Sequence, residues 1–592
     1  MITDAEHIAQ YWASLAVDEL VRNGIKRFCI SPGSRSSPLA LAVARHDQAK
    51  ATIHFDERGA AFFALGWARA EGRPAAVITT SGTAVANCMP AVVEASVDGV
   101  PMILLTADRP PELRTTGANQ TIRQVGLFGE LVRWFFDLPV PSEDVDPTFV
   151  LTTVDQAVHR TLEDPGPVHL NWMFREPLAP VGSNRFEPPI NVALGRWLDG
   201  EAPYTFYDAP ERRPSRRQVE KIVTAVRDAR FGVIVAGRLR HGKDGEMAMR
   251  LADILGWPIL RDALSNVPGT NENLIVPHFD LLLKSDLIRK AFRPDFVLHL
   301  GARATCKELY THLSVNAPRS FVLVAPHRDR IDAVHRVTMR VEAEVAGFCD
   351  SLIRRLDGKI EALAGTAWPA NLAKRVDDLI ENEVFADDKI SEPAVARHLT
   401  AALPSGHDLF VSASMPVRDV DMFGRILRSG RCVANRGASG IDGTVASAVG
   451  FACGRGRPLT LLIGDLALLH DMNSLDLVRQ SEQPITIVVI NNDGGGVFSF
   501  LQISEFEEVF EKYFGTPHGL SFRRAAEMFS LRYFAPESHS EYVEAFRTAS
   551  EMGQSNMIEV KTSRQENRDR HLQIYRAVDE LAALVPSAHS EA

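Results

Sequence analysis

Short β-branched apolar runs alternate with longer helical patterns along most of the chain. This alternation constrains the fold strongly, because strands separated by helix-length connections pair in parallel and are covered by helices. The strand candidates fall into three groups, at 27–31, 52–55, 75–79 and 101–106, then 231–236, 296–300 and 321–324, and finally 409–411, 459–463 and 485–490. Helices are expected at 57–71 and 84–97. The sequence therefore predicts an α/β protein with three doubly wound parallel-sheet domains.

The length of 592 residues is too great for one hydrophobic core, which agrees with several domains. Pro, Gly, Asn and charged residues without periodicity indicate a linker after the first group, and a largely helical connection precedes the third. The expected boundaries are 1–182 for the first domain, 183–216 for the linker, 217–357 for the central domain, 358–389 for the connection and 390–592 for the last domain.

The first and third groups share one arrangement of strands and helices. Gly82 precedes Pro101 by 19 residues, and Gly464 precedes Pro484 by 20, each pair bracketing a helical stretch between two apolar strands. Any two βαβ units look somewhat alike, but together with the motifs below the correspondence suggests internal duplication.

Composition and charge exclude several classes of protein. The formal net charge is −10, so nothing global favours nucleic acid or an anionic membrane, and an anionic substrate needs local Arg and Lys. The six cysteines form no C-x-x-C pair, which indicates reduced thiols in a cytoplasmic protein. The N-terminus has no signal-peptide pattern, and no apolar run reaches about 18 residues, so no membrane span is expected.

Two polar motifs follow apolar strands in the last third. Asp465 directly follows the strand at 459–463 and Gly464, and Asn492 comes 27 residues later, after the strand at 485–490. Mg²⁺ prefers oxygen ligands, which the Asp465 carboxylate, the Asn492 amide and the Gly494 carbonyl could supply. The carboxyl ends of neighbouring strands bind ligands in open α/β sheets, and the helix opening at 465–469 could receive a diphosphate. Either motif alone is an ordinary turn or loop, but the pair at this spacing indicates a metal and diphosphate site.

This pair resembles the GDG-x(about 27)-NN signature of thiamine-diphosphate enzymes, with Leu466 in place of the last Gly. The resemblance implies thiamine diphosphate held through Mg²⁺ or Mn²⁺. Such enzymes need one carboxylate in an apolar pocket to hydrogen-bond the aminopyrimidine ring, and Glu57, at the start of a helix with the apolar face 60–65, fits that role. The simpler interpretation of Glu57 is an acid favoured by the helix dipole. In the resembling enzymes the pyrimidine and the diphosphate bind different subunits, which implies a homodimer or a dimer of dimers.

Longer motifs narrow the resemblance. Six segments are similar to the 2-succinyl-5-enolpyruvyl-6-hydroxy-3-cyclohexene-1-carboxylate (SEPHCHC) synthase family of menaquinone biosynthesis: SPGSRSSPLALA (31–42), HFDERGAAFFALG (54–66), TSGTAVANCMPAVVEA (80–95), LTADRPPELRTTGANQTIRQVGLFG (105–129), NRGASGIDGT (435–444) and NNDGGGVFSFL (491–501). GARATCKEL (301–309) matches more loosely. The resemblance implies a transferase that decarboxylates 2-oxoglutarate and adds the resulting carbanion equivalent to isochorismate.

Both of these substrates carry two carboxylates, which guanidinium groups hold well. The resemblance nominates substrate contacts at Ser34, Arg35, Arg109, Asn119, Gln120, Lys307, Arg418 and Arg436. It nominates cofactor contacts at Ser414, Gly440, Ile441, Gly464, Asp465, Leu466, Asn492, Val497 and Phe498, in addition to Glu57. Taken singly, each Arg is more often a surface ion-pair partner and each Ser a turn or cap residue.

Three alternatives stay open at this point. One is another thiamine-diphosphate-dependent decarboxylase or carboligase, such as an acetohydroxyacid synthase. A second is a P-loop NTPase, since 237–244 mimics a phosphate-binding loop, although Asp244 stands where a hydroxyl is needed. A third is a non-catalytic protein that keeps the fold, against which the presence of Glu57 and Asp465 argues.

Overall fold

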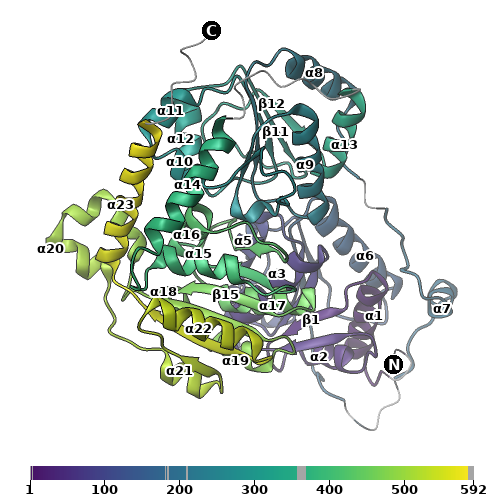
Figure 1. The fold of residues 1–592 in the computed structure, drawn as a ribbon. Helices are drawn as coiled ribbons and strands as arrows, with labels where there is room; N and C mark the ends of the chain where they lie inside the picture. Colours follow the sequence, from purple (N-terminus) through teal and green to yellow (C-terminus); the bar gives the residue numbers. More distant parts are fainter. Residues whose placement is uncertain are drawn as a thin grey trace. The chain divides into compact units, whose positions relative to one another are not determined.

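The computed structural model describes residues 2, 5–180, 182, 186–208, 211–356 and 368–583. The chain forms two compact units. Unit 1 contains Met1–Pro210, Asn435–Arg457 and His470–Gln483, and unit 2 contains Glu211–Ala434, Pro458–Leu469 and Pro484–Ala592. Figure 1 traces the elements of both units.

Unit 1 is built on a six-stranded parallel sheet with the order β2-β1-β3-β4-β6-β5. Its strands are β1 (Arg27–Ile30), β2 (Lys50–Ile53), β3 (Ala75–Thr79), β4 (Met102–Asp108), β5 (Trp134–Leu138) and β6 (Pro167–Met173). Its helices are α1 (Ile8–Arg22), α2 (Ser37–Ala44), α3 (Glu57–Glu71), α4 (Thr83–Asn87), α5 (Met89–Asp98), α6 (Thr148–Glu163), α7 (Val192–Leu198), α17 (Thr444–Arg455) and α19 (Leu475–Gln480). Three of the four predicted strands are confirmed, the fourth, β2, begins and ends two residues before the predicted 52–55, and β5 and β6 were not anticipated.

One helical expectation in unit 1 needs correction, and part of the predicted linker is helical. The single helix expected at 84–97 is two helices, α4 and α5, which meet at Cys88. Pro90, at the second position of α5, has no N–H and so cannot continue the hydrogen bonds of a preceding helix. Helix α7 lies inside the segment expected to be a linker. It is fixed by Glu19 of α1, which accepts hydrogen bonds from Trp197 Nε1 (2.6 Å) and from the Tyr204 N–H (2.6 Å).

Helices α3 and α17 cross within unit 1 at very close range. A Cβ atom on Gly66 would lie 2.0 Å from the Ser447 carbonyl oxygen, and one on Gly450 would lie 2.1 Å from that of Phe63. The Ser447 hydroxyl also donates to the Phe62 carbonyl at 3.2 Å. The absence of side chains at Gly66 and Gly450 therefore allows the two backbones to touch, and it joins residues about 380 positions apart in sequence into one unit.

Unit 2 holds two further six-stranded parallel sheets, with the orders β12-β11-β10-β7-β8-β9 and β14-β13-β15-β16-β18-β17. The strands of the first are β7 (Gly232–Ala236), β8 (Ile259–Arg261), β9 (Ile275–Val276), β10 (Phe296–Leu300), β11 (Ser320–Ala325) and β12 (Met339–Glu342). Those of the second are β13 (Asp408–Val411), β14 (Cys432–Val433), β15 (Leu459–Gly464), β16 (Ile485–Asn491), β17 (Arg532–Phe534) and β18 (Asn556–Lys561). Six of these strands were predicted, and the α/β class with three parallel sheets is confirmed.

The sheet of unit 1 and the second sheet of unit 2 share one strand order. Replacing each strand of the first by its counterpart twelve numbers later gives the order of the other. This agreement bears out the correspondence that the sequence suggested between the first and third groups of strands.

The helices of unit 2 cover both faces of its sheets. They are α8 (Arg216–Arg227), α9 (Gly242–Leu255), α10 (Phe279–Leu282), α11 (Asp286–Ala291), α12 (Lys307–Val315), α13 (Val345–Leu356), α14 (Trp368–Val384), α15 (Glu392–Ala402), α16 (Met415–Phe423), α18 (Asp465–His470), α20 (Glu507–Phe510), α21 (Arg523–Met528), α22 (His539–Glu551) and α23 (Arg564–Ala583). On the first sheet, Ile234 and Ala236 of β7 pack with α8, α9 and α13, whereas Val233 and Val235 pack with the opposite layer, which includes α14 and α23. Successive side chains of β7 therefore pack into the apolar layers on the two opposite faces of the sheet, as a doubly wound sheet requires.

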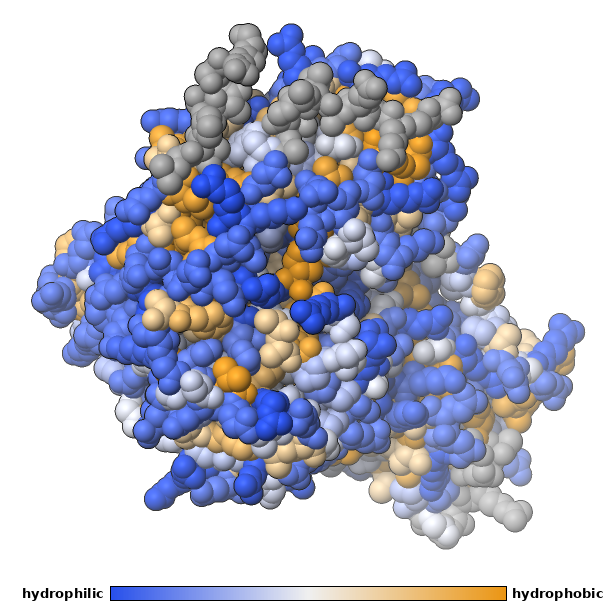
Figure 2. Space-filling model, in the orientation of Figure 1, coloured by the Kyte–Doolittle hydropathy of each residue, from blue (hydrophilic) through white to orange (hydrophobic). Residues whose placement is uncertain are grey.

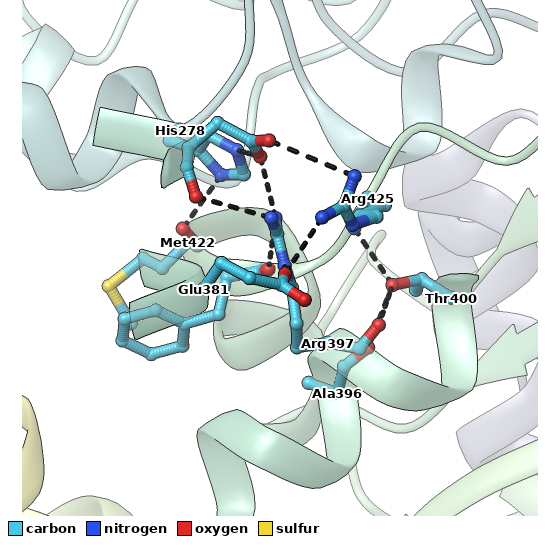
Figure 3. Close-up of polar contacts among 9 residues, drawn as sticks. His278, Glu381, Ala396, Arg397, Thr400, Met422 and Arg425 are labelled. Atoms are coloured by element: carbon cyan, nitrogen blue, oxygen red, sulfur yellow. Dashed lines mark hydrogen bonds and ion pairs between the residues drawn. The ribbon is translucent and has the colours of Figure 1, made fainter. Parts of the chain in front are cut away.

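An ion network ties α14 to α15 and to the end of α16 (Figure 3). Arg397 of α15 is fully buried and donates to Asp377 Oδ1 (2.6 Å) and Glu381 Oε2 (2.9 Å) of α14. His278 Nε2 lies 2.9 Å from Asp377 Oδ1, and its Nδ1 lies 2.9 Å from the Met422 carbonyl. Arg425 completes the network by donating to Glu381 at 2.8 Å. These contacts fix α14, part of the predicted connection, to α15, to His278 and to the end of α16, all within unit 2.

The visible surface in Figure 2 is mostly hydrophilic, with apolar residues in small separate patches. Among the described residues, no helix has the length and apolar character needed to cross a membrane. The boundaries of the domains and linkers remain predictions.

Candidate active site

The two predicted metal-binding side chains lie at the same edge of a sheet in unit 2. Strands β15 and β16 are parallel neighbours with Gly464 paired to Ile490, and Asp465 and Asn492 follow these strands. The Gly494 N–H donates to Asp465 Oδ2 at 2.9 Å, which closes the loop after β16 onto the end of β15. The structure thus brings Asp465, Asn492 and Gly494 together.

The donor atoms of this site fit a hard cation. Asn492 is 7% exposed, and its Oδ1 is buried without a hydrogen-bond partner among the described residues. Asp465 is 2% exposed, and burial raises the pKa of its carboxyl group, although hydrogen bonds from Gly494, Leu466 and His518 act in the opposite direction. A bound cation would satisfy the open amide oxygen and compensate the buried charge, and one carboxylate with neutral oxygens is the ligand set that Mg²⁺ takes beside a phosphate.

His518 is a neighbour of Asp465 that the sequence did not reveal. Its Nδ1 accepts from the Leu520 N–H at 3.0 Å, so the ring proton is assigned to Nε2, which donates to Asp465 Oδ2 at 3.2 Å. The segment GTPHGL (515–520) reads as a turn, and nothing in its spacing points to Asp465. Contact across 53 residues comes from tertiary folding.

Other predicted cofactor residues of unit 2 surround this edge. Ser414 directly precedes α16 as its N-cap residue with φ of +71°, and the Arg418 guanidinium donates to its carbonyl. Phe498 packs edge-on against Phe514, with ring centroids 5.7 Å apart. Gly464, Leu466 and Val497 are half-buried, as are Ser414, Arg418 and Phe498.

Gly494 permits the loop after β16 to pass close to its neighbour. It has φ of +131°, and a Cβ atom there would lie 1.9 Å from the Gly515 carbonyl oxygen. A side chain at this position would therefore push the 494–496 loop away from 514–516.

Two arginines form the corresponding polar edge of unit 1. Arg35 follows β1 and Arg109 follows β4, and both are buried. Arg35 Nη1 donates to the Phe174 carbonyl at 2.9 Å, and Arg109 Nη2 to the Asn119 carbonyl at 3.0 Å. Burial and the neighbouring Arg109 charge lower the pKa of Arg35. Within the described residues, Arg35 Nε and Arg109 Nη1 are buried without a hydrogen-bond partner, so this pair is suited to an anion.

The loop that carries Asn119 and Gln120 is anchored beside this pair. Gln120 Nε2 donates to the Ser81 carbonyl at 2.9 Å, and the Ser81 hydroxyl donates back to the Gln120 carbonyl at 3.0 Å. The Arg35 N–H donates to Thr80 Oγ1 at 3.3 Å, so both loops meet the end of β3. Ser34 and the side chains of Asn119 and Gln120 are exposed at this edge.

A buried amide supports that loop from below. Gln124 accepts from the Gly82 N–H at 2.9 Å and donates to Asn171 Oδ1 at 3.0 Å. Asn171 in turn donates to Asp108 Oδ2 at 2.9 Å. Sequence reasoning missed both amides, because a Gln in a polar loop and an Asn in a strand give no signal of their pairing.

Glu57 occupies the first position of α3 and is half-buried in unit 1. The cap of this helix is Asp56, whose side chain accepts from the Arg58 N–H at 2.9 Å. Glu57 Oε2 instead accepts from Asn87 Nδ2 of α4 at 3.0 Å. Capping therefore does not require Glu57, which is directed toward a neighbouring polar group.

The remaining nominated residues belong to two other segments, 435–443 of unit 1 and the start of α12 in unit 2. Gly440, Ile441 and Arg436 belong to the 435–443 segment of unit 1, whose Gly437 and Ala438 N–H groups donate to Glu94 at 2.8 and 2.7 Å. Lys307 is exposed at the start of α12 in unit 2, and the adjacent Glu308 pairs with Lys284 at 2.8 Å. No contact recorded for the described residues joins Lys307 to Asp465 or Arg418.

The P-loop alternative fails on the position of Asp244. Its carboxylate accepts from the His241 and Ala346 N–H groups, each at 3.0 Å, and is buried at the start of α9. The position where a phosphate-binding loop needs a hydroxyl therefore holds a buried carboxylate that is already bonded to two backbone N–H groups.

Comparison with known proteins first defines the class. Residues 12–127 match the model "Thiamine pyrophosphate enzyme, N-terminal TPP binding domain", residues 189–411 match "Middle domain of thiamine pyrophosphate", and residues 419–560 match "Thiamine pyrophosphate enzyme, C-terminal TPP binding domain". Thiamine pyrophosphate is thiamine diphosphate. The three matches follow the chain order of the three sheets.

Full-length relatives narrow the class to a family. The chain is 48% identical to the 2-succinyl-5-enolpyruvyl-6-hydroxy-3-cyclohexene-1-carboxylate synthase of Salinibacter ruber over 98% of this chain and 99% of that protein. It is 48% identical to the protein of the same name from Rubrobacter xylanophilus, over 95% and 97%, and 43% identical to that from Prosthecochloris aestuarii, over 96% of each. The chain belongs to the SEPHCHC synthase family.

Proposed function

We propose that this protein is a thiamine-diphosphate-dependent transferase that decarboxylates 2-oxoglutarate and joins the resulting four-carbon unit to isochorismate, giving SEPHCHC for menaquinone biosynthesis. Relatives named SEPHCHC synthase at 43–48% identity support this reaction. The structural observation that carries the proposal is the open, buried Asn492 Oδ1 beside Asp465 at the ends of neighbouring strands. Thiamine diphosphate, when bound, supplies the nucleophilic carbon that accepts the oxo acid and stabilises the charge left by decarboxylation.

In this proposal the residues of unit 2 hold the diphosphate. Asp465, Asn492 and the Gly494 carbonyl would hold Mg²⁺ or Mn²⁺, which would offset the negative charge of the diphosphate. Ser414, Gly464 and Leu466 line the diphosphate site, and Val497 and Phe498 form apolar walls. His518 orients Asp465, because its Nε2–H donates to Asp465 Oδ2 and so holds the carboxylate in one direction relative to the metal.

The residues of unit 1 handle the proton and the substrate carboxylates. Glu57 holds a proton at the pyrimidine ring nitrogen, with Gly440 and Ile441 as further cofactor contacts. Arg35 and Arg109 bind substrate carboxylates through their open N–H groups, with Ser34, Asn119 and Gln120 as neutral partners. Arg418, Arg436 and Lys307 are proposed as further anion contacts.

The assembly is proposed to be a homodimer or a dimer of dimers, with each active site formed between subunits. The enzyme is proposed to act in the cytoplasm, where its six free cysteines would remain reduced.

A coupled assay tests the reaction. The protein is incubated with thiamine diphosphate, Mg²⁺, 2-oxoglutarate and isochorismate, while carbon dioxide release and isochorismate consumption are followed together. Carbon dioxide release and isochorismate consumption should proceed at equal rates. Carbon dioxide release should slow when isochorismate is left out, and both rates should fall when the metal is left out. Turnover of pyruvate in preference to 2-oxoglutarate would overturn the proposal in favour of another carboligase.

A further inference from the structure

We infer that Glu392 is a positioning residue for the metal site, because it fixes which end of the Asn492 amide faces the cation. This inference rests on the proposed function. Neither the sequence motifs nor the family comparison points to Glu392, which opens α15, 73 residues before Asp465.

Glu392 contacts Asn492 directly and inside unit 2. It is 2% exposed, and its Oε1 accepts from Asn492 Nδ2 at 2.9 Å and from Thr562 Oγ1 at 3.1 Å. Asn492 follows β16 and Thr562 follows β18, which is the neighbouring strand. Glu392 therefore reaches the edge of the sheet from a helix and joins two strand ends.

The chemistry of the pair sets the direction of the amide. The two ends of an Asn amide have nearly the same shape, but only the oxygen can ligate Mg²⁺. An ionised Glu392 accepts hydrogen bonds and does not donate them, so it selects the NH₂ end of Asn492 and leaves Oδ1 on the opposite side. Burial and the Asp419 charge raise the pKa of Glu392 to about 7, so metal binding is measured above that pH. Thr562 cannot make this selection, because a hydroxyl both donates and accepts.

Nearby charged groups do not replace Glu392 in this role. Asp419, a buried acid close enough to act electrostatically on Glu392, lies 2.9 Å from His571 Nε2 and is thereby paired. Among the hydrogen bonds of the described residues, the only side-chain acceptor for Asn492 Nδ2 is Glu392. Loss of this acceptor would let the amide turn its NH₂ group toward the cation.

The test measures metal binding directly, with Mn²⁺ as the probe and the electron paramagnetic resonance signal of the free ion as the readout, at a fixed concentration of thiamine diphosphate. Glu392→Met has similar length and no acceptor, and we expect it to weaken Mn²⁺ binding by about 10- to 100-fold. Glu392→Gln keeps the shape but offers either an acceptor or a donor to Asn492, so we expect Mn²⁺ binding between that of Glu392→Met and that of wild type. Thr562→Val is the matched control, because it removes the other donor to the same oxygen while leaving the Glu392–Asn492 contact, and it should change binding less than about twofold.

A second comparison separates positioning from a general structural role. The Asn492→Asp variant offers oxygen at both ends of the side chain and places a second carboxylate against Glu392, so the two negative charges repel. Glu392→Gln should then tighten Mn²⁺ binding several-fold when it is combined with Asn492→Asp, although it does not in wild type. A role in packing alone predicts the same direction in both backgrounds.

The outcomes distinguish this inference from the proposed function. If Asp465→Ala binds Mn²⁺ and thiamine diphosphate as wild type does, the metal site itself is wrong. If Asp465→Ala loses binding but Glu392→Met keeps it, the metal site stands and the positioning role of Glu392 is overturned. Thermal unfolding of the metal-free proteins identifies a variant that fails to fold. If Glu392→Met fails to fold, the test is the effect of Glu392→Gln on Mn²⁺ binding with and without Asn492→Asp. An equal change in Mn²⁺ binding in both backgrounds would refute the inference.

Discussion

Replacing Gly66 by Ala should destabilise the protein, although the same change in most helices is stabilising. Gly66 lies inside α3, where Ala has a helix propensity roughly 1 kcal/mol better than Gly. The crossing with α17 reverses this preference. The added Cβ atom would lie 2.0 Å from the Ser447 carbonyl oxygen, whereas ordinary van der Waals contact begins at 3.4 Å.

The structure sets the magnitude of this effect. Relief of the clash requires the two helices to separate by about 1.4 Å at this point, the difference between 3.4 and 2.0 Å. The obstructing atom belongs to the backbone, so no side-chain rotation can make room. Overpacking of this kind costs typically about 1–3 kcal/mol and sometimes more, and we take about 3–4 kcal/mol for a backbone clash. After the gain in helix propensity, the expected net loss is about 2–3 kcal/mol.

Differential scanning calorimetry measures the result, with Gly195→Ala as the matched control. Gly195 lies in α7 of the same unit, and a Cβ atom there would meet nothing within 4 Å. We expect Gly66→Ala to lower the unfolding midpoint by several degrees, on the order of 2–4 °C per kcal/mol, and Gly195→Ala to raise it slightly. A midpoint for Gly66→Ala equal to or above that of wild type would show that the α3–α17 crossing is not as close as described.

Four further outcomes follow from the site and the ion network. Glu57→Gln should nearly abolish turnover in the coupled assay while leaving the unfolding midpoint unchanged, and wild-type rates would contradict its role. Asp465→Ala should weaken thiamine diphosphate binding, and an unchanged titration would count against the metal site. Arg109→Gln should raise KM for 2-oxoglutarate by about tenfold or more, since one charged hydrogen bond contributes about 1.5–3 kcal/mol, and an unaltered KM would remove Arg109 from the site. Burial acts to raise the pKa of Asp377, but His278 and Arg397 lower it well below its usual range. This carboxylate therefore adds stability above about pH 4 that is lost as the pH falls through the folded pKa, and Asp377→Asn should flatten the pH dependence of the urea midpoint between about pH 5 and 2.

The sequence predicted those parts of the fold that local patterns specify. Apolar β-branched runs such as 75–79 and 485–490 are buried on both faces, so they stand out from their surroundings. Strand β5 was missed because its residues are largely half-buried at the edge of the sheet, and β9 and β14 because each has two residues. The close packing of α17 on α3 was not predictable from either helix alone. A Gly inside a helical pattern ordinarily indicates only a less stable helix and does not indicate a close contact with another helix.

The residues of the candidate site likewise divide into those that local sequence patterns indicate and those that only tertiary structure brings together. Asp465 and Asn492 could be found because each follows a buried strand, and strand order then brings them together. Arg35 and Arg109 were nominated by family resemblance, and no pattern in the chain indicated that the two guanidinium groups would be buried as neighbours. Glu392, Gln124 and His518 act through side-chain contacts across 42 to 100 residues, and such pairings depend on tertiary structure that a single sequence does not reveal.

The polar atoms left open at the two candidate sites, the strand ends beside Asp465 and the arginine pair of unit 1, have opposite character, and this difference indicates what each site binds. At the strand ends that carry Asp465, the open atom is an acceptor, Asn492 Oδ1, next to a buried carboxylate, so a cation or a hydrogen-bond donor would stabilise it. Beside β1 and β4 of unit 1 the open atoms are donors on two adjacent guanidinium groups, Arg35 Nε and Arg109 Nη1, which suit an anion even though Arg35 Nη2 also lies 3.3 Å from Glu176 Oε1. Buried polar groups without partners cost about 1–3 kcal/mol each, and folding alone gives no reason to keep them. A protein that binds a metal-held diphosphate and then a dicarboxylate needs both, because the metal neutralises the cofactor while the arginines hold the substrate. The open atoms therefore argue for two ligands of opposite charge at two separate polar edges, which a carboligase with a magnesium-bound cofactor and anionic substrates would satisfy.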